Sequence, residues 1–259
     1  MRDITQILDS PLWVFALSLV ALWLVTAAGA YLSALHARCH EKIPDDFGTI
    51  LGATLTLSAL IIGFTFSMSI SRYEQRKNCE AAEANSIGTE FARAELLSAT
   101  DKESVQSLLK LYLAQRIEFY TATNPSSLGI IRSRTSVLQG KLWAAVVGSS
   151  PSRSPAIDAL IVSEMNTVLD SEGYTQAAWW NRIPTSAWIL MFAIALISQL
   201  LVGFGAHSKI TRLLPVVLPL AVAISFFLIA DIDSPRAGII RVRPQNLLSV
   251  SESINTPQP

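Results

Sequence analysis

Charged side chains are missing from four long stretches of this sequence. The stretches without any Asp, Glu, Lys or Arg are residues 12–35, 47–71, 183–206 and 213–230. A helix needs about 20 apolar residues to cross the hydrocarbon core of a bilayer. The composition, 51% hydrophobic and 15% charged, is also typical of a multi-pass membrane protein. We predict an all-α integral membrane protein with four spans, at about 12–35, 49–71, 184–206 and 213–230.

Enzyme motifs are absent as well. The chain has no Gly-rich phosphate loop, no H-E-x-x-H, no C-x-x-C and no G-x-S-x-G. No span carries an ionisable residue that could relay protons or bind a coupling ion. Glu83, Glu90 and Glu95 are the only candidate catalytic carboxylates, and they are more simply a solvated or ion-paired helix face. We therefore expect neither enzyme activity nor a cofactor.

The charges gather in one segment, residues 72–182, which holds 12 of the 20 basic and 12 of the 20 acidic side chains. We predict a helical domain there, between a first membrane hairpin (1–71) and a second (183–233), followed by a tail (234–259). Its balanced charge argues against nucleic-acid binding.

The topology follows from basic residues near the span ends. Eight lie on the side of the termini and of segment 72–182, against four on the other side. The positive-inside rule places the termini and this domain in the cytoplasm, which makes the chain an inner-membrane protein with the bilayer as its first partner. Ala28-Gly29-Ala30 could be a leader cleavage site, but the N-terminal residues are net acidic and the apolar run continues, so we expect the span to be retained.

Helical periodicity dominates the charged segment. The second span is expected to continue as one helix to about residue 97, followed by helices at about 101–123, 133–147 and 156–169. "NPSSLG" (124–129) should end the helix before it. Strand-like alternation is limited to "GIIRVR" (238–243), and residues 249–259 have the composition of a disordered tail.

The second span is rich in hydroxyl side chains, with eight between residues 49 and 71, whereas the other spans have three, three and one. Such neutral groups, with apolar constrictions beside them, can line an ion pore. They can equally let helices pack closely and hydrogen-bond to one another. The candidate pore-lining residues are Thr54, Ser58, Ile62, Thr65, Phe66, Ser69 and Ile70.

Metal sites are weakly indicated. His36, His40 and His207 fall in the two loops predicted on the outer side, and His36 and His40 have the i, i+4 spacing of zinc ligands. Histidines at helix ends need no metal, so we expect none. Asp231 and Asp233 could bind a cation, although a role at a turn or helix end is simpler.

The segment "IGFTFSMSISRYEQRKNCEAAEANSIG" (62–88) resembles the part of bestrophin-type channels where the second membrane helix leaves the bilayer. Closer still, the chain looks like a member of the bacterial four-span membrane proteins described as bestrophin-like, and the likeness extends from the second span to Gly238. The residues that carry it are Arg72, Tyr73, Glu83, Asn85, Gly88, Arg93, Arg116, Asp231, Asp233, Pro235 and Gly238.

This resemblance implies a homopentamer whose second helices line a passive ion path, with Ile62, Phe66 and Ile70 at its neck and anions as candidate permeant ions. The acidic cluster that binds calcium in animal bestrophins has no counterpart here. An alternative function is that of a membrane-anchored sensor or scaffold, whose helical domain binds a partner while the hydroxyl groups only pack helices.

Overall fold

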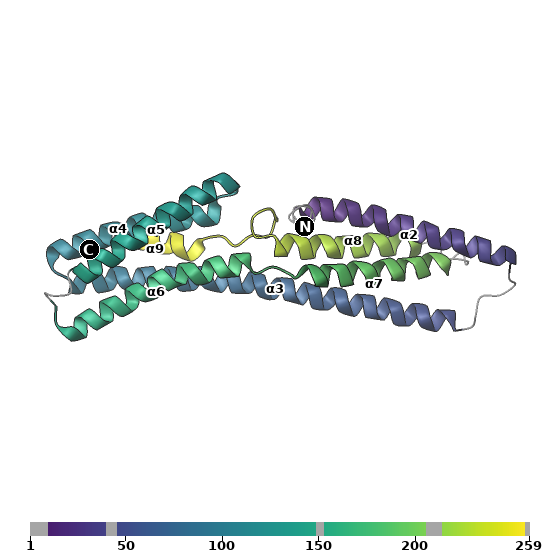
Figure 1. The fold of residues 1–259 in the computed structure, drawn as a ribbon, viewed down its shortest axis with the longest axis horizontal. Coiled ribbons are helices and arrows are strands. Elements are labelled where there is room, and N and C mark those ends of the chain that lie inside the picture. The colour runs from purple at the N-terminus through teal and green to yellow at the C-terminus, as the bar shows by residue number, and fades with distance from the viewer. Residues whose placement is uncertain (1–9, 40–45, 149–152, 206–213, 257–259) are drawn as a thin grey trace. The chain divides into compact units, whose positions relative to one another are not determined.

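The computed structural model describes residues 10–39, 46–148, 153–205 and 214–256. These residues are almost entirely helical, and none of them forms a β-strand, as predicted. In chain order the elements are α2 (Pro11–Cys39), α3 (Phe47–Arg93), a 3-10 turn (Ala94–Leu96), α4 (Ala99–Thr121), α5 (Pro125–Gly148), α6 (Pro155–Trp180), α7 (Thr185–Phe204), α8 (Leu214–Asp233) and α9 (Gln245–Asn255). Figure 1 shows these helices along the chain.

Four helical stretches are long and apolar enough to cross a membrane: Pro11–Arg38, Phe47–Leu96, Pro155–Phe204 and Pro215–Asp233. Helices cover the four predicted spans, except for Pro184, which precedes α7, and Gly205, which follows it; residues 206 and 213 lie outside the described residues. Span two belongs to a 47-residue helix, α3, that continues well past the apolar stretch.

The chain divides into two compact units. The first, here called the membrane unit, comprises Met1–Tyr73 and Arg182–Arg241, and the second, the polar unit, comprises Glu74–Asn181 and Val242–Pro259. Helix α3 contributes its first part to the membrane unit and its second part to the polar unit.

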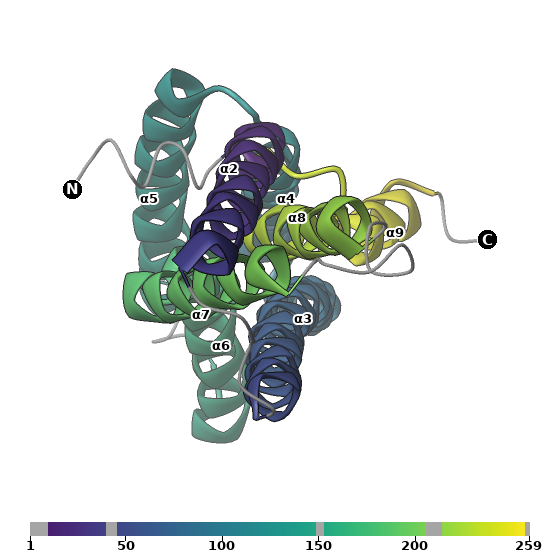
Figure 2. The ribbon, with the colours of Figure 1, turned by 90° about the vertical axis from the view of Figure 1, so that its right-hand side faces the viewer.

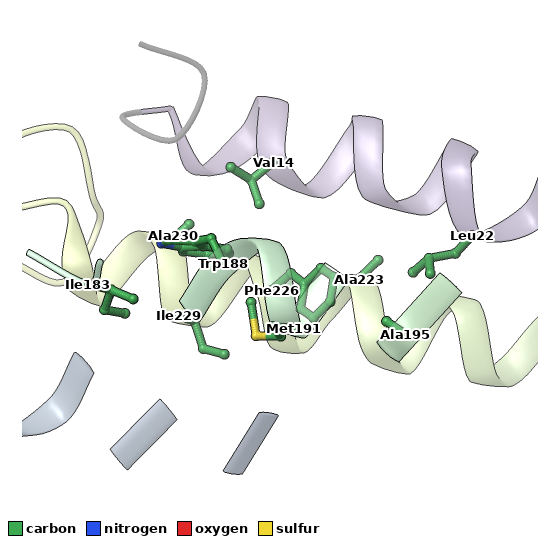
Figure 3. Packing of buried hydrophobic residues seen from close by; sticks show 10 residues of the cluster. All are labelled: Val14, Leu22, Ile183, Trp188, Met191, Ala195, Ala223, Phe226, Ile229 and Ala230. Atoms are coloured by element: carbon green, nitrogen blue, oxygen red, sulfur yellow. The ribbon is translucent and has the colours of Figure 1, made fainter. Parts of the chain in front are cut away.

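The membrane unit is built around α7 and α8. Helix α2 packs against both of them, and Figure 2, which looks along the helices, shows α2 and the first part of α3 on opposite sides of this pair. Helices α2, α7 and α8 share a core in which large apolar side chains pack closely with alanines. Figure 3 shows this core, formed by Val14, Leu22, Ile183, Trp188, Met191, Ala195, Ala223, Phe226, Ile229 and Ala230.

Helices α2 and α7 approach each other at two glycines. A Cβ atom at Gly29 would lie 2.2 Å from the carbonyl oxygen of Leu200, and one at Gly203 would lie 2.0 Å from that of Thr26. Small residues are what allow membrane helices to come so close. The Thr26 hydroxyl, 3.2 Å from Gln199 Oε1, adds a polar contact at the same crossing.

The polar unit packs α4 against α5, α5 against α6 and α9 against α4. Its helix starts carry ordinary N-caps: the hydroxyl of Ser98 accepts from Asp101 N at 3.3 Å, and that of Ser154 accepts from Ile157 N at 3.5 Å. Such caps satisfy donors that a helix start leaves without an intrahelical partner.

Three expectations about helix boundaries in this unit were wrong. Helix α5 begins at Pro125 rather than near 133, because Asn124 caps it: Asn124 Oδ1 accepts from Ser126 N at 3.1 Å, and proline is favoured at a first helical position. Helix α6 continues beyond 169 to Trp180, where it buries Ala178 and Trp179. The sequence "NPSSLG" is thus a helix start as well as a stop.

The third correction concerns the C-terminus, where residues 249–255 belong to helix α9 instead of a disordered tail. Glu80, which is 1% exposed, holds the start of this helix by accepting from Asn246 N at 2.9 Å and from Leu247 N at 3.0 Å. A carboxylate at a helix N-terminus is favourable because it satisfies free N–H groups and complements the helix dipole. This short, polar segment therefore forms a helix because of one residue, Glu80, that is distant in the sequence.

Candidate functional site

The four hydroxyl candidates on α3 face the interior of the membrane unit, whereas the other hydroxyl side chains of span two, at Thr49, Thr56, Ser67 and Ser71, are exposed. Ser58, Thr65 and Ser69 are 5%, 4% and 0% exposed, and Thr54 is half-buried. Three of these hydroxyls donate to carbonyl oxygens of their own helix, all at 2.8 Å: Thr54 to Ile50, Thr65 to Ile61, and Ser69 to Phe66. Within one chain, Ser58, Thr65 and Ser69 are therefore covered by the chain itself.

The other pore-lining candidates lie on the flank of the same helix. Phe66 is 36% exposed, and Ile62 and Ile70 are half-buried. Ile62 and Phe66 border a largely apolar groove of about 600 Å³ between α3, α7 and α8. The groove is open to the outside of the chain, and its polar groups come from Ser58, Ser198, Gln199 and Ser225.

A buried ion pair lies at the centre of the polar unit. Glu83 on α3 and Arg116 on α4 are 0% and 1% exposed, and the Arg116 Nε group donates to Glu83 Oε1. Glu83 Oε2 accepts from the hydroxyls of Tyr120 and Thr175, both at 3.2 Å. One carboxylate therefore joins α3, α4 and α6, and Glu83 is a structural centre rather than part of a solvated face.

Aromatic rings enclose this pair. The Arg116 guanidinium lies 4.6 Å from the centre of the Phe119 ring, a cation–π distance, and Trp179 packs edge-on against both Phe119 and Tyr120. Glu172 provides a second, longer ion pair with Arg116, at 3.6 Å. Burial and the Glu83 carboxylate raise the pKa of the Tyr120 hydroxyl well above its usual range, so this hydroxyl stays a donor.

In the part of α3 that belongs to the polar unit, the remaining family residues make contacts to other helices of that unit, except Asn85, which is exposed. Gly88 faces α9, where an added Cβ would lie 3.7 Å from the Val250 side chain. Arg93 reaches α6, donating to the carbonyl of Leu160 at 3.0 Å and pairing with Glu164 at 2.9 Å. These residues fix α9 and α6 against α3.

Glu90 stands out because it is fully buried and neither carboxylate oxygen has a hydrogen-bond partner among the described residues. Burial first, and then the nearby Glu164 carboxylate, raises the pKa of Glu90 to about 8, against the opposing effect of Arg93 and Arg153. The folded chain therefore binds a proton that the unfolded chain releases at lower pH. Stability should fall as the pH rises toward 8.

Replacing Glu90 with glutamine should remove this dependence. We expect Glu90→Gln to stabilise the polar unit by about 2 kcal/mol at pH 8.5, where the native carboxyl must ionise in a buried site, and to have little effect at pH 5.5. Thermal unfolding of the detergent-purified protein at the two pH values measures this. Glu74→Gln, at an exposed position of the same helix, is the control. Equal effects of Glu90→Gln at both pH values would contradict the expectation.

The two aspartates at the end of α8 bind backbone amides. Asp231 accepts from Ile239 N at 2.6 Å and from Ile240 N at 2.9 Å, and Asp233 accepts from Ile183 N at 3.1 Å and from Arg182 Nε at 3.3 Å. The helix-end role is the one that the structure supports. The segment 238–243, which alternates like a strand, is a loop folded onto this helix end.

Two further family residues belong to the same loop. Gly238 is buried, and a Cβ there would lie 2.2 Å from the Asp231 carbonyl oxygen, so this position requires glycine; Pro235 is half-buried. Arg72 and Tyr73, also half-buried, are the last residues that α3 contributes to the membrane unit.

Of the three histidines, only His36 lies in the part of the chain that the structure describes; His40 and His207 lie outside it. The His36 ring packs against Phe204, with the ring centres 5.7 Å apart. No cluster of three or more His, Cys, Asp or Glu side chains occurs among the described residues.

Sequence reasoning missed Glu80, Tyr120, Thr175 and Arg182 as partners in these contacts. Tyr120 and Thr175 lie 37 and 92 residues from Glu83, and Glu80 lies 166 residues from Asn246, so no local pattern links them. The apolar periodicity of α3 gave one usable signal, because it places Glu80, Glu83 and Glu90 on or beside the buried face.

Comparison with known proteins agrees with the fold. The Bestrophin-like domain profile matches residues 12–247. A crystal structure of a single-substitution variant of a bacterial bestrophin homolog from Klebsiella pneumoniae has a TM-score of 0.69 and 11% identity, covering 93% of this chain and 97% of that one. Another crystal structure of the Klebsiella pneumoniae homolog has a TM-score of 0.67 and 13% identity, with 92% and 95% covered. No functionally curated protein matches the sequence. Because the profile spans most of its length, the chain belongs to the bestrophin-like family.

Proposed function

We propose that this chain is one subunit of an oligomeric, passive ion channel of the inner membrane, a pentamer if it follows bestrophins, with anions as candidate permeant ions. Its termini and the polar unit would lie in the cytoplasm, as the basic residues near the span ends indicate.

The observation that carries the proposal is the exposure of α3. Only 6% of its most apolar 18-residue stretch is buried within the chain, against 28% for the stretch in Pro11–Arg38 and 39% for each of the two later ones. The span with the most hydroxyl groups is therefore the one that its own chain covers least. Copies arranged around an axis would cover it with one another.

The exposed face of α3 suits such neighbours. A Cβ atom added at Gly48, Gly52 or Gly63 would meet no other atom within 4 Å, so each glycine leaves open space on the outside of the chain. Small residues at membrane-helix interfaces allow another helix to approach closely. The groove of about 600 Å³ beside Gly63 offers room for a neighbouring side chain or helix ridge.

The path itself would be neutral. Ile62, Phe66 and Ile70 lie along the flank of α3 as candidates for the neck, and the charge-free spans contain no group that would trap an ion. The four hydroxyl candidates, Thr54, Ser58, Thr65 and Ser69, would hold α3 in place behind this flank and line the path only if α3 turned.

Native mass spectrometry of the detergent-purified protein is the first test. We expect a single closed oligomer, five subunits if the chain follows bestrophins, and ion flux after reconstitution into liposomes. In a monomer, α3 would have no α3 helices of other copies beside it to form an ion path. A monomer would therefore overturn the proposal.

Phe66→Ala tests the neck. If Phe66 narrows the path, removing its ring should raise the ion flux roughly twofold or more, since an apolar constriction limits conduction. Phe64→Ala is the matched control, because Phe64 is 65% exposed and points to a different side of α3. Liposome flux at equal protein density measures both. An unchanged flux in Phe66→Ala would remove Phe66 from the ion path.

The scaffold alternative has one observation in its favour. A groove of about 360 Å³ between α4 and α5 is lined mainly by apolar groups, with Leu111 57% and Val137 56% exposed at its edges. Exposed apolar patches of this kind can bind partners. A monomeric protein without flux would favour this function over the channel.

A further inference from the structure

The loop that follows α8 has a fixed shape. Its amides at Ile239 and Ile240 donate to the Asp231 carboxylate, which is only 2% exposed, and the Arg241 Nε group donates to the Gly238 carbonyl. Charge-assisted hydrogen bonds to a buried carboxylate are among the stronger ones in proteins. The residues between Ser234 and Arg241 are therefore held against the end of the helix.

This fixed loop presents two apolar side chains outward. Ile239 is 79% exposed, the largest exposed fraction among the large hydrophobic side chains of the described residues, and Ile240 is 39% exposed. Exposing an isoleucine side chain to water is unfavourable relative to burying it. Because the backbone amides of Ile239 and Ile240 are hydrogen-bonded to Asp231, the loop cannot turn these two side chains inward.

The loop lies at one end of the membrane unit. Asp231 is in the last turn of α8, and Val14 near the start of α2 packs with Trp188 near the start of α7 and with Ala230 (Figure 3). The same end exposes Leu12 and Trp13, by 71% and 62%, at the start of α2. Exposed tryptophan at the end of a membrane helix is typical of the lipid–water interface.

The charge of the loop is positive. Residues 234–241 contain Arg236 and Arg241 and no acidic residue, and the two aspartates that precede them are buried and hydrogen-bonded. A basic side chain beside an apolar tip is the chemistry that binds a bilayer surface rich in anionic lipids.

We propose that the loop Ser234–Arg241 inserts Ile239 and Ile240 into the interfacial layer of the surrounding bilayer, while the exposed Arg241 contacts the phosphates of anionic phospholipids. The loop would thereby anchor the end of α8 at a defined depth and make the protein prefer anionic lipid. This inference does not rest on the proposed channel activity, since any membrane protein with this loop could use it.

Fluorescence quenching in vesicles tests insertion. Ile239→Cys, in a chain that also carries Cys39→Ser and Cys79→Ser, is labelled with a fluorophore and reconstituted into phosphatidylcholine with or without phosphatidylglycerol. We expect strong quenching by a lipid spin-labelled near the headgroup end of its acyl chain, and several-fold weaker quenching by aqueous iodide than at the exposed control site Ser136→Cys. Ile240→Cys repeats the experiment if the first variant does not fold.

The other outcomes overturn the proposal. Iodide quenching equal to that at Ser136→Cys would place the loop in water. Protection from both quenchers would mean that protein, such as a second copy of this chain, covers Ile239. The anionic preference has its own test: phosphatidylglycerol should increase the lipid quenching, Arg241→Gln should abolish this increase, and Arg241→Lys should keep most of it. An increase that survives Arg241→Gln would refute the role of that arginine.

Discussion

Glu83→Ala is expected to destabilise the polar unit by about 3–5 kcal/mol. The substitution leaves Arg116, which is 1% exposed, as a buried charge without its main partner. It also removes the acceptor that the hydroxyls of Tyr120 and Thr175 share. For a domain of this size the loss corresponds to a fall in melting temperature of roughly 10 °C or more.

A second ion pair provides the control. Glu95 pairs with Lys102 at 2.5 Å, but their side chains are 57% and 37% exposed. Exposed pairs contribute little to stability because water and salt screen them, so Glu95→Ala should change the melting temperature only slightly. Thermal unfolding followed by circular dichroism distinguishes the two variants. Equal, small effects of Glu83→Ala and Glu95→Ala would mean that Arg116 finds another partner or reaches water.

The double variant Glu83→Leu with Arg116→Met separates the cost of an unpaired charge from the value of the pair itself. Replacing both partners of a buried pair by apolar groups is often nearly neutral, whereas removing one is not. We expect this variant to be much closer to the native stability than Glu83→Ala. If it is as unstable as Glu83→Ala, the pair is required for the fold by its own interactions.

The sequence was enough to predict that Glu83 lies on a helix, but not which residues surround it. Helical periodicity needs only neighbours along the chain, and it correctly extended span two into a helix past residue 71. The partners of Glu83 come from α4 and α6, far away in sequence, so a pattern with a period of 3.6 residues carries no information about them. The resemblance to a family was the better signal, since Glu83 and Arg116 are both among the eleven residues that carry it.

The hydroxyl groups of α3 illustrate a second limit. Their spacing correctly placed Thr54, Ser58, Thr65 and Ser69 on one face of a helix. Spacing does not say whether that face turns toward the same chain, toward another copy or toward an ion path. Only the packing of α7 and α8 against α3 resolves this for the single chain, where these residues face inward.

The prediction of a disordered tail at the end of the chain was wrong for a related reason. Residues 249–255 are polar and short, and a helix of 11 residues is marginal by itself. Helix α9 exists because Glu80 satisfies its first amides and because Gly88 leaves room for Val250. Both contacts depend on tertiary structure, so composition alone indicated disorder.

Gly203→Ala should have the largest effect in the membrane unit. The added Cβ would lie 2.0 Å from the Thr26 carbonyl oxygen and 3.0 Å from the Ala30 nitrogen, and both are backbone atoms that cannot rotate away. Helices α2 and α7 would have to separate, which would also lengthen the contact between Thr26 and Gln199. Overpacking usually costs about 1–3 kcal/mol, and a clash with backbone should lie at or above the upper end of that range.

Gly140→Ala is the control, because a Cβ at this exposed position inside α5 meets no atom within 4 Å and alanine favours a helix over glycine. Thermal unfolding of both variants in the same detergent, followed by tryptophan fluorescence, gives the comparison. Gly203→Ala should melt several degrees lower and Gly140→Ala no lower than the native chain. A native melting temperature for Gly203→Ala would show that α2 and α7 do not cross this closely.

A double variant tests whether the two glycines act at one crossing. If Gly203→Ala and Gly29→Ala each lower the stability, the double variant should lose less stability than the sum of the two single losses, because one separation of the helices relieves both clashes.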